Sequence, residues 1–410
     1  MKRDEIANLF EGMRPLDVTE YIILAAMVAV LPFGWSLAVK ALFLLVVNTI
    51  VKAIVTRKVG NPALRGLPRW SVWLMLAFYL YCLFTLCFST NMEYGLRMLG
   101  HRLPLLLFPL CCLVSDMSWL DMRRRRVLMW LLPLSLSLRL VVRCIAVFLV
   151  GHSFVFGTSI DPIHHTYLAM YQLLALGFIY SELVTGWKQL SRRQAAAVAV
   201  VTAMVVAHLV LVFSRTGILG LVLMTIAIVF HQLFLLKNVR VGLGVALVAA
   251  VFVVGFVTLM PEEGRRFGKT VNEVSDGDMS DIRIWQYREG VKGVVQHLPF
   301  GVGVGDGLDA LHEAYRNSTD TRLQHCGLNA HNIFIDAAMS MGLPGLLLLV
   351  AMFVVPSVHA VRRRDITLMA FLFAFLLTGM FEAILNRQMG LMFVGMYWLV
   401  LLGGEACHDA

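Results

Sequence analysis

Long apolar runs recur along the whole 410-residue chain and constrain its fold more than any other feature. Each run is about 17–25 residues long, the length that a helix needs to cross the hydrocarbon core of a bilayer. Hydrophobic residues make up 59% of the chain and charged residues only 15%. The runs are continuous rather than alternating in polarity, so they predict transmembrane helices and not the strands of a barrel. The sequence therefore predicts an all-α polytopic membrane protein in which residues 1–410 form a single membrane domain.

Twelve runs fit this pattern, and we expect about twelve transmembrane helices. They cover approximately residues 21–36, 38–55, 70–88, 103–119, 127–150, 163–183, 195–213, 217–236, 241–260, 331–358, 366–385 and 388–403. The first run leads into Pro32 and Lys40 without a small-residue cleavage site, so we expect no cleaved signal peptide.

The basic residues that give the chain its net charge of +9 lie mostly in alternate short loops. Clusters such as Arg123–Arg126 and Arg362–Arg364 all fall on one side of the predicted membrane. The short loops of the other side hold only Arg97, Arg102, Arg215 and Arg387. The positive-inside rule then places both termini in the cytoplasm and residues 261–330, between the ninth and tenth helices, in the periplasm. This distribution indicates membrane orientation and contact with lipids rather than binding of nucleic acid.

The periplasmic loop at 261–330 is the only long polar segment of the chain. From 281 to 297 its apolar residues recur at helical spacing, which predicts a helix within the loop. The glycine-rich run at 301–307 lacks the Gly-Lys-Ser/Thr of a phosphate-binding loop, so we interpret it as a turn. The seven cysteines show no metal-type spacing. We therefore expect neither a metal nor another cofactor.

Three residues at the outer ends of predicted helices are candidates for catalysis, and each allows two interpretations. Arg215, in a short turn between two spans, is either a snorkelling side chain or a fixed cation that faces a lipid phosphate. Arg283 lies in the first turn of the loop helix, where a cation opposes the helix dipole. It binds either an anionic ligand or a neighbouring acid, Asp281 or Glu289. His331 is either an ordinary interfacial residue or a base suited to near-neutral pH.

Several further residues on the outer side are candidates for binding substrate. They are Asn332, Arg288, Arg97, Arg102, His165 and Tyr167. Asn332 and Asp336 also follow His331 closely enough in sequence to orient its ring, although Asp336, five residues on, is poorly placed on the same helix face. Arg139 and Arg143 lie within a span and share one helix face, so we expect a structural ion pair there with Glu382 as a candidate partner.

Three motifs resemble the O-antigen ligase/polymerase family of bacterial envelope enzymes. The first is Ser214-Arg-Thr-Gly217 between two spans. The second is Asp281-Ile-Arg283-Ile-Trp285, followed by Leu298-Pro-Phe-Gly301-Val-Gly303. The third is His331-Asn332, nine residues, and then Gly342-Leu-Pro-Gly345.

The resemblance implies a metal-independent, inverting glycosyltransferase of the GT-C type in the bacterial inner membrane, with its active site at the periplasmic face. Such an enzyme transfers a glycan from undecaprenyl pyrophosphate to a sugar hydroxyl of lipid A–core during lipopolysaccharide biosynthesis. Carried over by position, His331 is then the base that deprotonates the acceptor, and Arg215 and Arg283 bind the pyrophosphate. Permanently charged, bidentate arginine suits that task.

Two relatives within the family remain alternatives, the O-antigen polymerase and the protein O-oligosaccharyltransferase. The single long loop and the short C-terminal tail favour the ligase over both. A secondary transporter is the alternative from another class. It would need a midplane polar site and, preferably, repeated halves, and no internal repeat is visible in the sequence.

Overall fold

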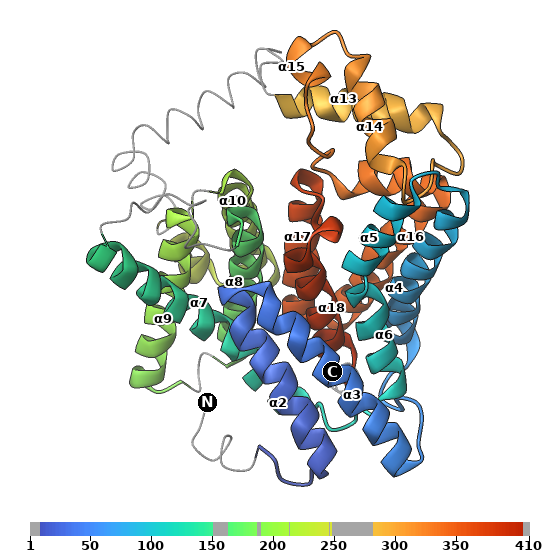
Figure 1. Ribbon diagram of the computed structural model, residues 1–410. Helices are drawn as coiled ribbons and strands as arrows, with labels where there is room; N and C mark the ends of the chain where they lie inside the picture. The colour runs from blue at the N-terminus through green and yellow to red at the C-terminus, as the bar shows by residue number, and fades with distance from the viewer. Residues whose placement is uncertain are drawn as a thin grey trace.

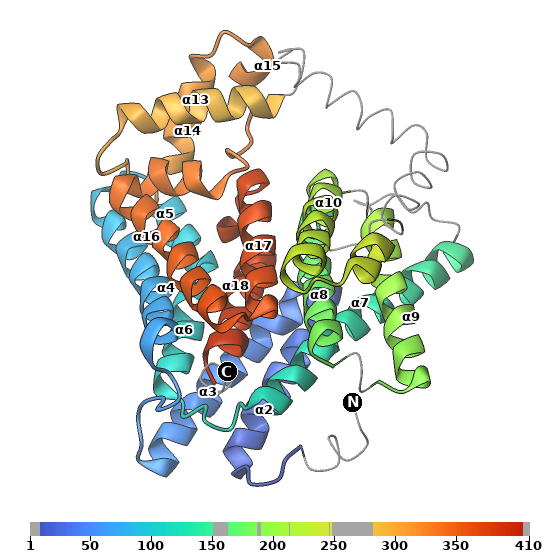
Figure 2. The ribbon, with the colours of Figure 1, turned by 180° about the vertical axis from the view of Figure 1, so that it is seen from behind.

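The computed structural model describes residues 9–150, 163–186, 190–212, 214–245, 247 and 282–404. Every regular element within these ranges is helical. Figures 1 and 2 show a bundle of long helices with α13, α14 and α15 gathered above one of its ends. The long helices are α2 (Pro15–Val30), α3 (Trp35–Thr56), α4 (Gly66–Thr85), α7 (Met122–Val150), α8 (His165–Gly186), α9 (Arg192–Leu211), α10 (Arg215–Phe230), α16 (Ile333–Arg363), α17 (Ile366–Phe381) and α18 (Gln388–Leu402). The shorter ones are α5 (Met92–His101), α6 (Pro104–Val114), α13 (Ile282–Gln296), α14 (Gly307–Arg316) and α15 (Thr321–Gln324), with single turns η1 (Leu31–Phe33), η2 (Leu86–Phe88), η4 (His231–Leu235) and η5 (Ile384–Asn386).

The helices agree with a multi-pass membrane protein. Eight described segments are long and apolar enough to cross a membrane, and α5 with α6, bent by 43°, make a ninth if the pair is one span. The apolar helices α17 and α18 are shorter, with 16 and 15 residues. The eight long segments, the bent pair α5–α6 and the two shorter helices α17 and α18 correspond to eleven of the twelve predicted spans. Of the remaining span, 241–260, only residues 241–245 and 247 are described, so the number twelve stays a prediction.

The fourth predicted span needs a correction at its start. We expected it at 103–119, but the helical segment begins at Met92 and breaks near Arg102 before α6 continues. Helix α5 carries Glu93 and Arg97 on its exposed face, so its hydropathy is too low to resemble a membrane span. The break leaves Arg102 buried between the two halves.

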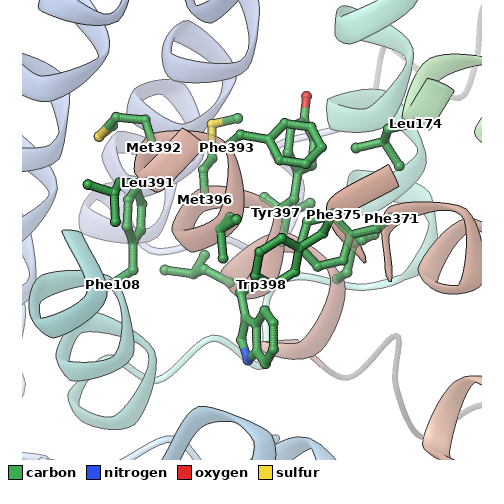
Figure 3. Close-up of a cluster of buried hydrophobic side chains, with 14 of the residues drawn as sticks. Phe108, Leu174, Phe371, Phe375, Leu391, Met392, Phe393, Met396, Tyr397 and Trp398 are labelled. Carbon is green, nitrogen blue, oxygen red and sulfur yellow. The ribbon is translucent and has the colours of Figure 1, made fainter. Parts of the chain in front are cut away.

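Helices α17 and α18 form the centre of the bundle. Helix α18 is buried from Gly390 to Leu402, as expected for a helix that is apolar on all sides. Figure 3 shows Phe371 and Phe375 of α17 against Phe393 and Trp398 of α18. The ring centroids of Phe371 and Phe393 are 5.5 Å apart. This aromatic core fixes the positions of the helix ends at which the polar residues gather.

The basic residues hold one end of the bundle together. Arg125, near the start of α7, pairs with Asp365 between α16 and α17 at 2.5 Å. Lys52 of α3 lies between two acids of α2, at 2.7 Å from Asp17 and 2.6 Å from Glu20. We refer to this end as the basic end. The opposite end, where α16 begins and α17 finishes, carries the predicted site residues.

Helix α16 is interrupted at Gly342, where φ is 63° and ψ is −158°. The preceding turns, 333–341, form a separate short helix above the long part of α16 (Figure 2). The backbone of 299–303 fits into this break. Leu343 N donates to Pro299 O (2.7 Å), Val302 N to Met339 O (3.0 Å) and Gly303 N to Ser340 O (2.8 Å). Two of the sequence motifs are therefore in direct contact through their backbones.

A second contact holds the same segment on the turn between η2 and α5. Asp306 accepts hydrogen bonds from the backbone N–H groups of Thr90 (2.6 Å) and Asn91 (2.8 Å) and from the Thr90 hydroxyl (2.9 Å). We refer to these three bonds as the Asp306 clasp. The run at 301–307 is thus a turn, as predicted, and it is fastened to two separate parts of the bundle.

Candidate functional site

His331 lies immediately before α16 and is paired with an acid from another helix. Its Nδ1 is 3.2 Å from Oε2 of Glu382, the residue that follows α17. Both side chains are largely enclosed, with exposed fractions of 18% and 9%. The backbone of His331 has a φ of 46°, a conformation that is uncommon for a residue with a side chain and often marks a functional site. The pairing directs the other ring nitrogen, Nε2, away from Glu382.

Asn332 fixes His331 to the helix that follows. Its Oδ1 accepts from the backbone N–H groups of Phe334 (2.8 Å) and Ile335 (3.1 Å), and so caps α16. Its Nδ2 donates to the carbonyl of Met380 at 3.1 Å. Through these contacts Asn332 joins the start of α16 to the end of α17. Binding of substrate by Asn332 stays a prediction.

The helix α13 is attached directly to this site. The Tyr287 hydroxyl donates to the carbonyls of Met380 (2.8 Å) and His331 (3.3 Å). The prediction of a loop helix at 281–297 is confirmed, since α13 spans Ile282–Gln296. Arg283 lies in its first turn, as expected. Glu289, one of the acids considered as its partner, instead accepts from Lys292 at 2.8 Å.

His164, just before α8, lies near charged and titratable residues from four other parts of the chain. Glu382, His331, Arg283 and Arg387 all act electrostatically on its imidazole. Its ring lies against that of His165, with centroids 3.9 Å apart. Two residues further on, the hydroxyl of Tyr167 is buried and has no hydrogen-bond partner among the described residues. The predicted residues Arg283, His331 and His165 are therefore close together.

Arg215 is the first residue of α10 and is exposed. A Cβ added at Gly217 would lie 2.7 Å from the Cβ of Ala169 on α8, so the first turns of α8 and α10 are in close contact. Ala169 lies four positions after His165 on α8. Arg215 therefore lies at the same end of the bundle as His165 and the His331–Glu382 pair.

A pocket of about 320 Å³ opens beside His331. Its polar lining comes from α5, from the start of α16 and from the segment between α17 and α18. The polar and charged lining residues are Tyr94, Arg97, His101, Arg102, Asn329, His331, Asp336, Ser340, Glu382, Asn386 and Arg387. The predicted residues Arg97 and Arg102 thus share one pocket with His331.

Arg102 supports this pocket from beneath. Its Nη2 donates to Asp336 Oδ2 (3.0 Å) and to Asn386 Oδ1 (2.6 Å), and Asn386 Nδ2 donates to Asp336 Oδ1 (2.8 Å). Arg102 is 2% exposed. Asp336, which we expected to be near enough to orient the ring of His331, is instead bound to Arg102 and Asn386. Glu382 is the acid that contacts His331.

The remaining predicted residues have identified surroundings. Arg97 is exposed and pairs with Glu93 at 2.8 Å. Arg288 lies over the ring of Trp285, with its Cζ 5.2 Å from the centroid. The expected ion pair of Glu382 with Arg139 or Arg143 is replaced by the contact with His331, and Arg139 donates to the carbonyl of Pro32 at 2.5 Å.

Among the described residues, no group of three or more His, Cys, Asp or Glu side chains is arranged to hold a metal ion. The fold and the site define a helical multi-pass membrane protein with a cation-rich pocket and a histidine–glutamate pair at one end of its bundle. Residues 198–350 match the family model described as O-antigen ligase. The matched region contains all three motifs, so the match supports the resemblance drawn from them. Among curated proteins, none matches this chain.

The matched region includes Arg215, Arg283 and His331 and ends within α16. Glu382, Asn386 and Arg387 lie beyond it, and they enter the site only through the fold. Members of the matched family are glycosyltransferase-like ligases and polymerases.

Proposed function

We propose that this protein is an O-antigen ligase. It transfers a glycan from undecaprenyl pyrophosphate to a sugar hydroxyl of lipid A–core, at the periplasmic face of the inner membrane and with inversion. The observation that carries the proposal is the His331–Glu382 pair, which lies among arginines at the end of the bundle where α8, α10 and α16 begin and α17 ends. On this proposal the scaffold belongs to the GT-C type.

His331 acts as the general base in this reaction. In the neutral ring, Nδ1–H donates to Glu382, which leaves the lone pair of Nε2 free to take a proton. As Nε2 removes the proton of the acceptor hydroxyl, the oxygen attacks the anomeric carbon of the donor sugar from the face opposite the leaving group. A carboxylate that orients the ring and stabilises the imidazolium is the same arrangement that acts in catalytic triads.

The arginines assist the departure of the pyrophosphate. As the bond between the anomeric carbon and the phosphate oxygen breaks, negative charge develops on the leaving lipid diphosphate. Arg215 and Arg283 offer permanent charge and paired N–H donors to that diphosphate. Pyrophosphate is a good leaving group, so positioning and charge stabilisation supply most of what the reaction needs.

The orientation in the membrane follows from the charges. The basic end, with Arg125 and the arginines at the end of α16, faces the cytoplasm, and the His331 end faces the periplasm. Single cysteines at Val59 and Arg316 test this in a variant that lacks the native cysteines. We expect an impermeant thiol reagent to label Arg316→Cys in spheroplasts and Val59→Cys only after lysis. Labelling in the opposite order would invert the orientation.

Transfer by the purified protein in liposomes tests the function itself. The donor is a glycan on undecaprenyl pyrophosphate, and the acceptors offered separately are lipid A–core and a second lipid-linked glycan. We expect product only with lipid A–core. Product only with the lipid-linked glycan would identify a polymerase. Uptake of a solute without any transfer would favour a transporter.

A further inference from the structure

The pocket beside His331 carries more positive charge than its own acids neutralise. Two carboxylates line it, and each already has a partner. Asp336 is bound by Arg102 and Asn386, and Glu382 is bound by His331. The positive charges of the residues that line the pocket are therefore not fully neutralised by its two carboxylates.

Arg387 supplies the unmatched charge. It precedes α18, is exposed and lines the pocket. No ion pair to Arg387 is present among the described residues, whereas Arg97 has Glu93 as its partner. On the floor of the pocket, Nε of Arg102 is fully buried and has no hydrogen-bond partner within the described ranges. That buried atom offers no surface to a ligand, whereas the exposed guanidinium of Arg387 suits a ligand that supplies acceptor oxygens.

The volume and position of the pocket indicate which substrate it holds. A pocket of about 320 Å³ has room for a sugar residue with a charged substituent. Its lining includes His331 but no residue of α8, α10 or α13, the helices that carry His165, Arg215 and Arg283. Arg215 and Arg283, to which the pyrophosphate is assigned, thus do not line this pocket. The pocket is then left for the second substrate.

We propose that this pocket is the acceptor subsite and that it selects a sugar carrying a negatively charged substituent, a phosphate or a carboxylate. This inference rests on the proposed glycan transfer. Arg387 binds the substituent and Arg102 closes the floor. The bound sugar then presents its hydroxyl to Nε2 of His331.

Three acceptor sugars that differ in a single substituent test the inference. One carries a hydroxyl, the second a phosphate and the third a carboxylate at that position. For the wild-type protein we expect kcat/KM to be at least about 10-fold higher for one of the charged acceptors than for the neutral one, the effect of one charge-assisted hydrogen bond. The comparison between phosphate and carboxylate identifies the charged group. In Arg387→Gln the preference should fall to near unity, mainly through the KM of the acceptor. Arg387→Lys should retain part of it, because lysine keeps the charge and loses the fork.

Arg316→Gln is the matched control, since it removes an exposed arginine of the same outer region that does not line the pocket. It should keep the wild-type preference. A wild-type protein without preference, or an Arg387→Gln variant that keeps it, would overturn the inference while leaving glycan transfer intact. A higher KM for the donor in Arg387→Gln would assign the pocket to the pyrophosphate instead.

Calorimetric binding of the charged saccharides without donor separates the two proposals. If no acceptor is glycosylated, the proposed function fails. The pocket inference still predicts that Arg387→Gln weakens binding of the preferred saccharide at least about 10-fold. Equal binding by the wild-type protein and the variant would refute it.

Discussion

Substitution of Gly342 by alanine tests the contact between the two sequence motifs. An added Cβ would lie 2.2 Å from the carbonyl oxygen of Pro299 and 2.3 Å from the carbonyl carbon of Phe300. Both neighbours are backbone atoms, so neither can rotate away. The φ and ψ of Gly342 also fall in a region that is almost restricted to glycine. We expect the segment 299–303 to leave the break in α16.

The expected change in the free energy of local opening follows from the backbone strain and from the hydrogen bonds that are lost. The strained backbone costs about 1–3 kcal/mol in a residue with a Cβ. The three backbone hydrogen bonds of the docked segment contribute roughly 0.5–1.5 kcal/mol each. The free energy of local opening should therefore fall by about 2.5–7.5 kcal/mol, the sum of these two terms. Since 1.4 kcal/mol corresponds to a factor of ten, amide exchange should accelerate by at least about 60-fold.

Hydrogen exchange at Val302, Gly303 and Leu343 measures this opening, because these three amides donate the bonds of the docked segment. Gly244→Ala is the control, since a Cβ at Gly244 would meet no atom within 4 Å. It should leave the exchange of these amides unchanged. Wild-type protection in Gly342→Ala would refute the close packing described for this break.

Three further predictions concern the site and its supports. Arg102→Met leaves Asp336 without its buried cation and should destabilise the protein by roughly 3–5 kcal/mol, while thermal unfolding of the double variant with Asp336→Leu should recover a large part of that loss. Burial raises the pKa of Asp306, but the hydrogen bonds of the Asp306 clasp outweigh it and leave the pKa below its ordinary value. The clasp therefore stabilises docking of the 301–307 turn above about pH 4 and is lost as the pH falls through the folded-state pKa of Asp306. Limited proteolysis should find Asp306→Ala as sensitive at neutral pH as the wild-type protein is only in acid. Glu382→Gln should lower transfer by up to about 10²–10⁴-fold, the contribution of a positioned base, with membrane levels unchanged on immunoblots; wild-type transfer would exclude the pairing with His331 from the mechanism.

The helices could be predicted from the sequence because their signal is local. A run of about 20 apolar residues is sufficient to indicate a membrane span, and helical spacing within the long loop predicted α13 almost to its ends. Helix α5 could not be found in this way. Its exposed face carries Glu93 and Arg97, so only its packing reveals that it continues into α6 across Arg102.

The site was predictable only where a motif marks it. The motifs identified His331, Arg283 and Arg215, and the structure places them at one end of the bundle. Glu382 and Arg387 lie about 50 residues after His331, and no local pattern connects them to it. An acidic residue within an apolar run is unusual, so Glu382 could be singled out from the sequence. The sequence, however, suggested an ion pair with the arginines of α7 and not a contact with His331.

The contact between the motifs was also beyond the sequence. In the sequence, the glycines at 342 and 345 stand only as part of the third motif. The structure instead brings the backbone of 299–303 into the break at Gly342. A hydrogen-bonded contact between the backbone of a turn and a helix break has no periodic signature, so it requires the folded chain.

Donor binding and glycan transfer, measured side by side for His331→Ala, test the central claim most directly. The pyrophosphate is assigned to the arginines and the proton to His331, so the two measurements should separate. We predict that His331→Ala binds the lipid-linked donor with near wild-type affinity while transfer falls by about 10²–10⁴-fold, the usual contribution of a general base. Near wild-type transfer by His331→Ala, or loss of donor binding that accounts for the whole defect, would contradict the account.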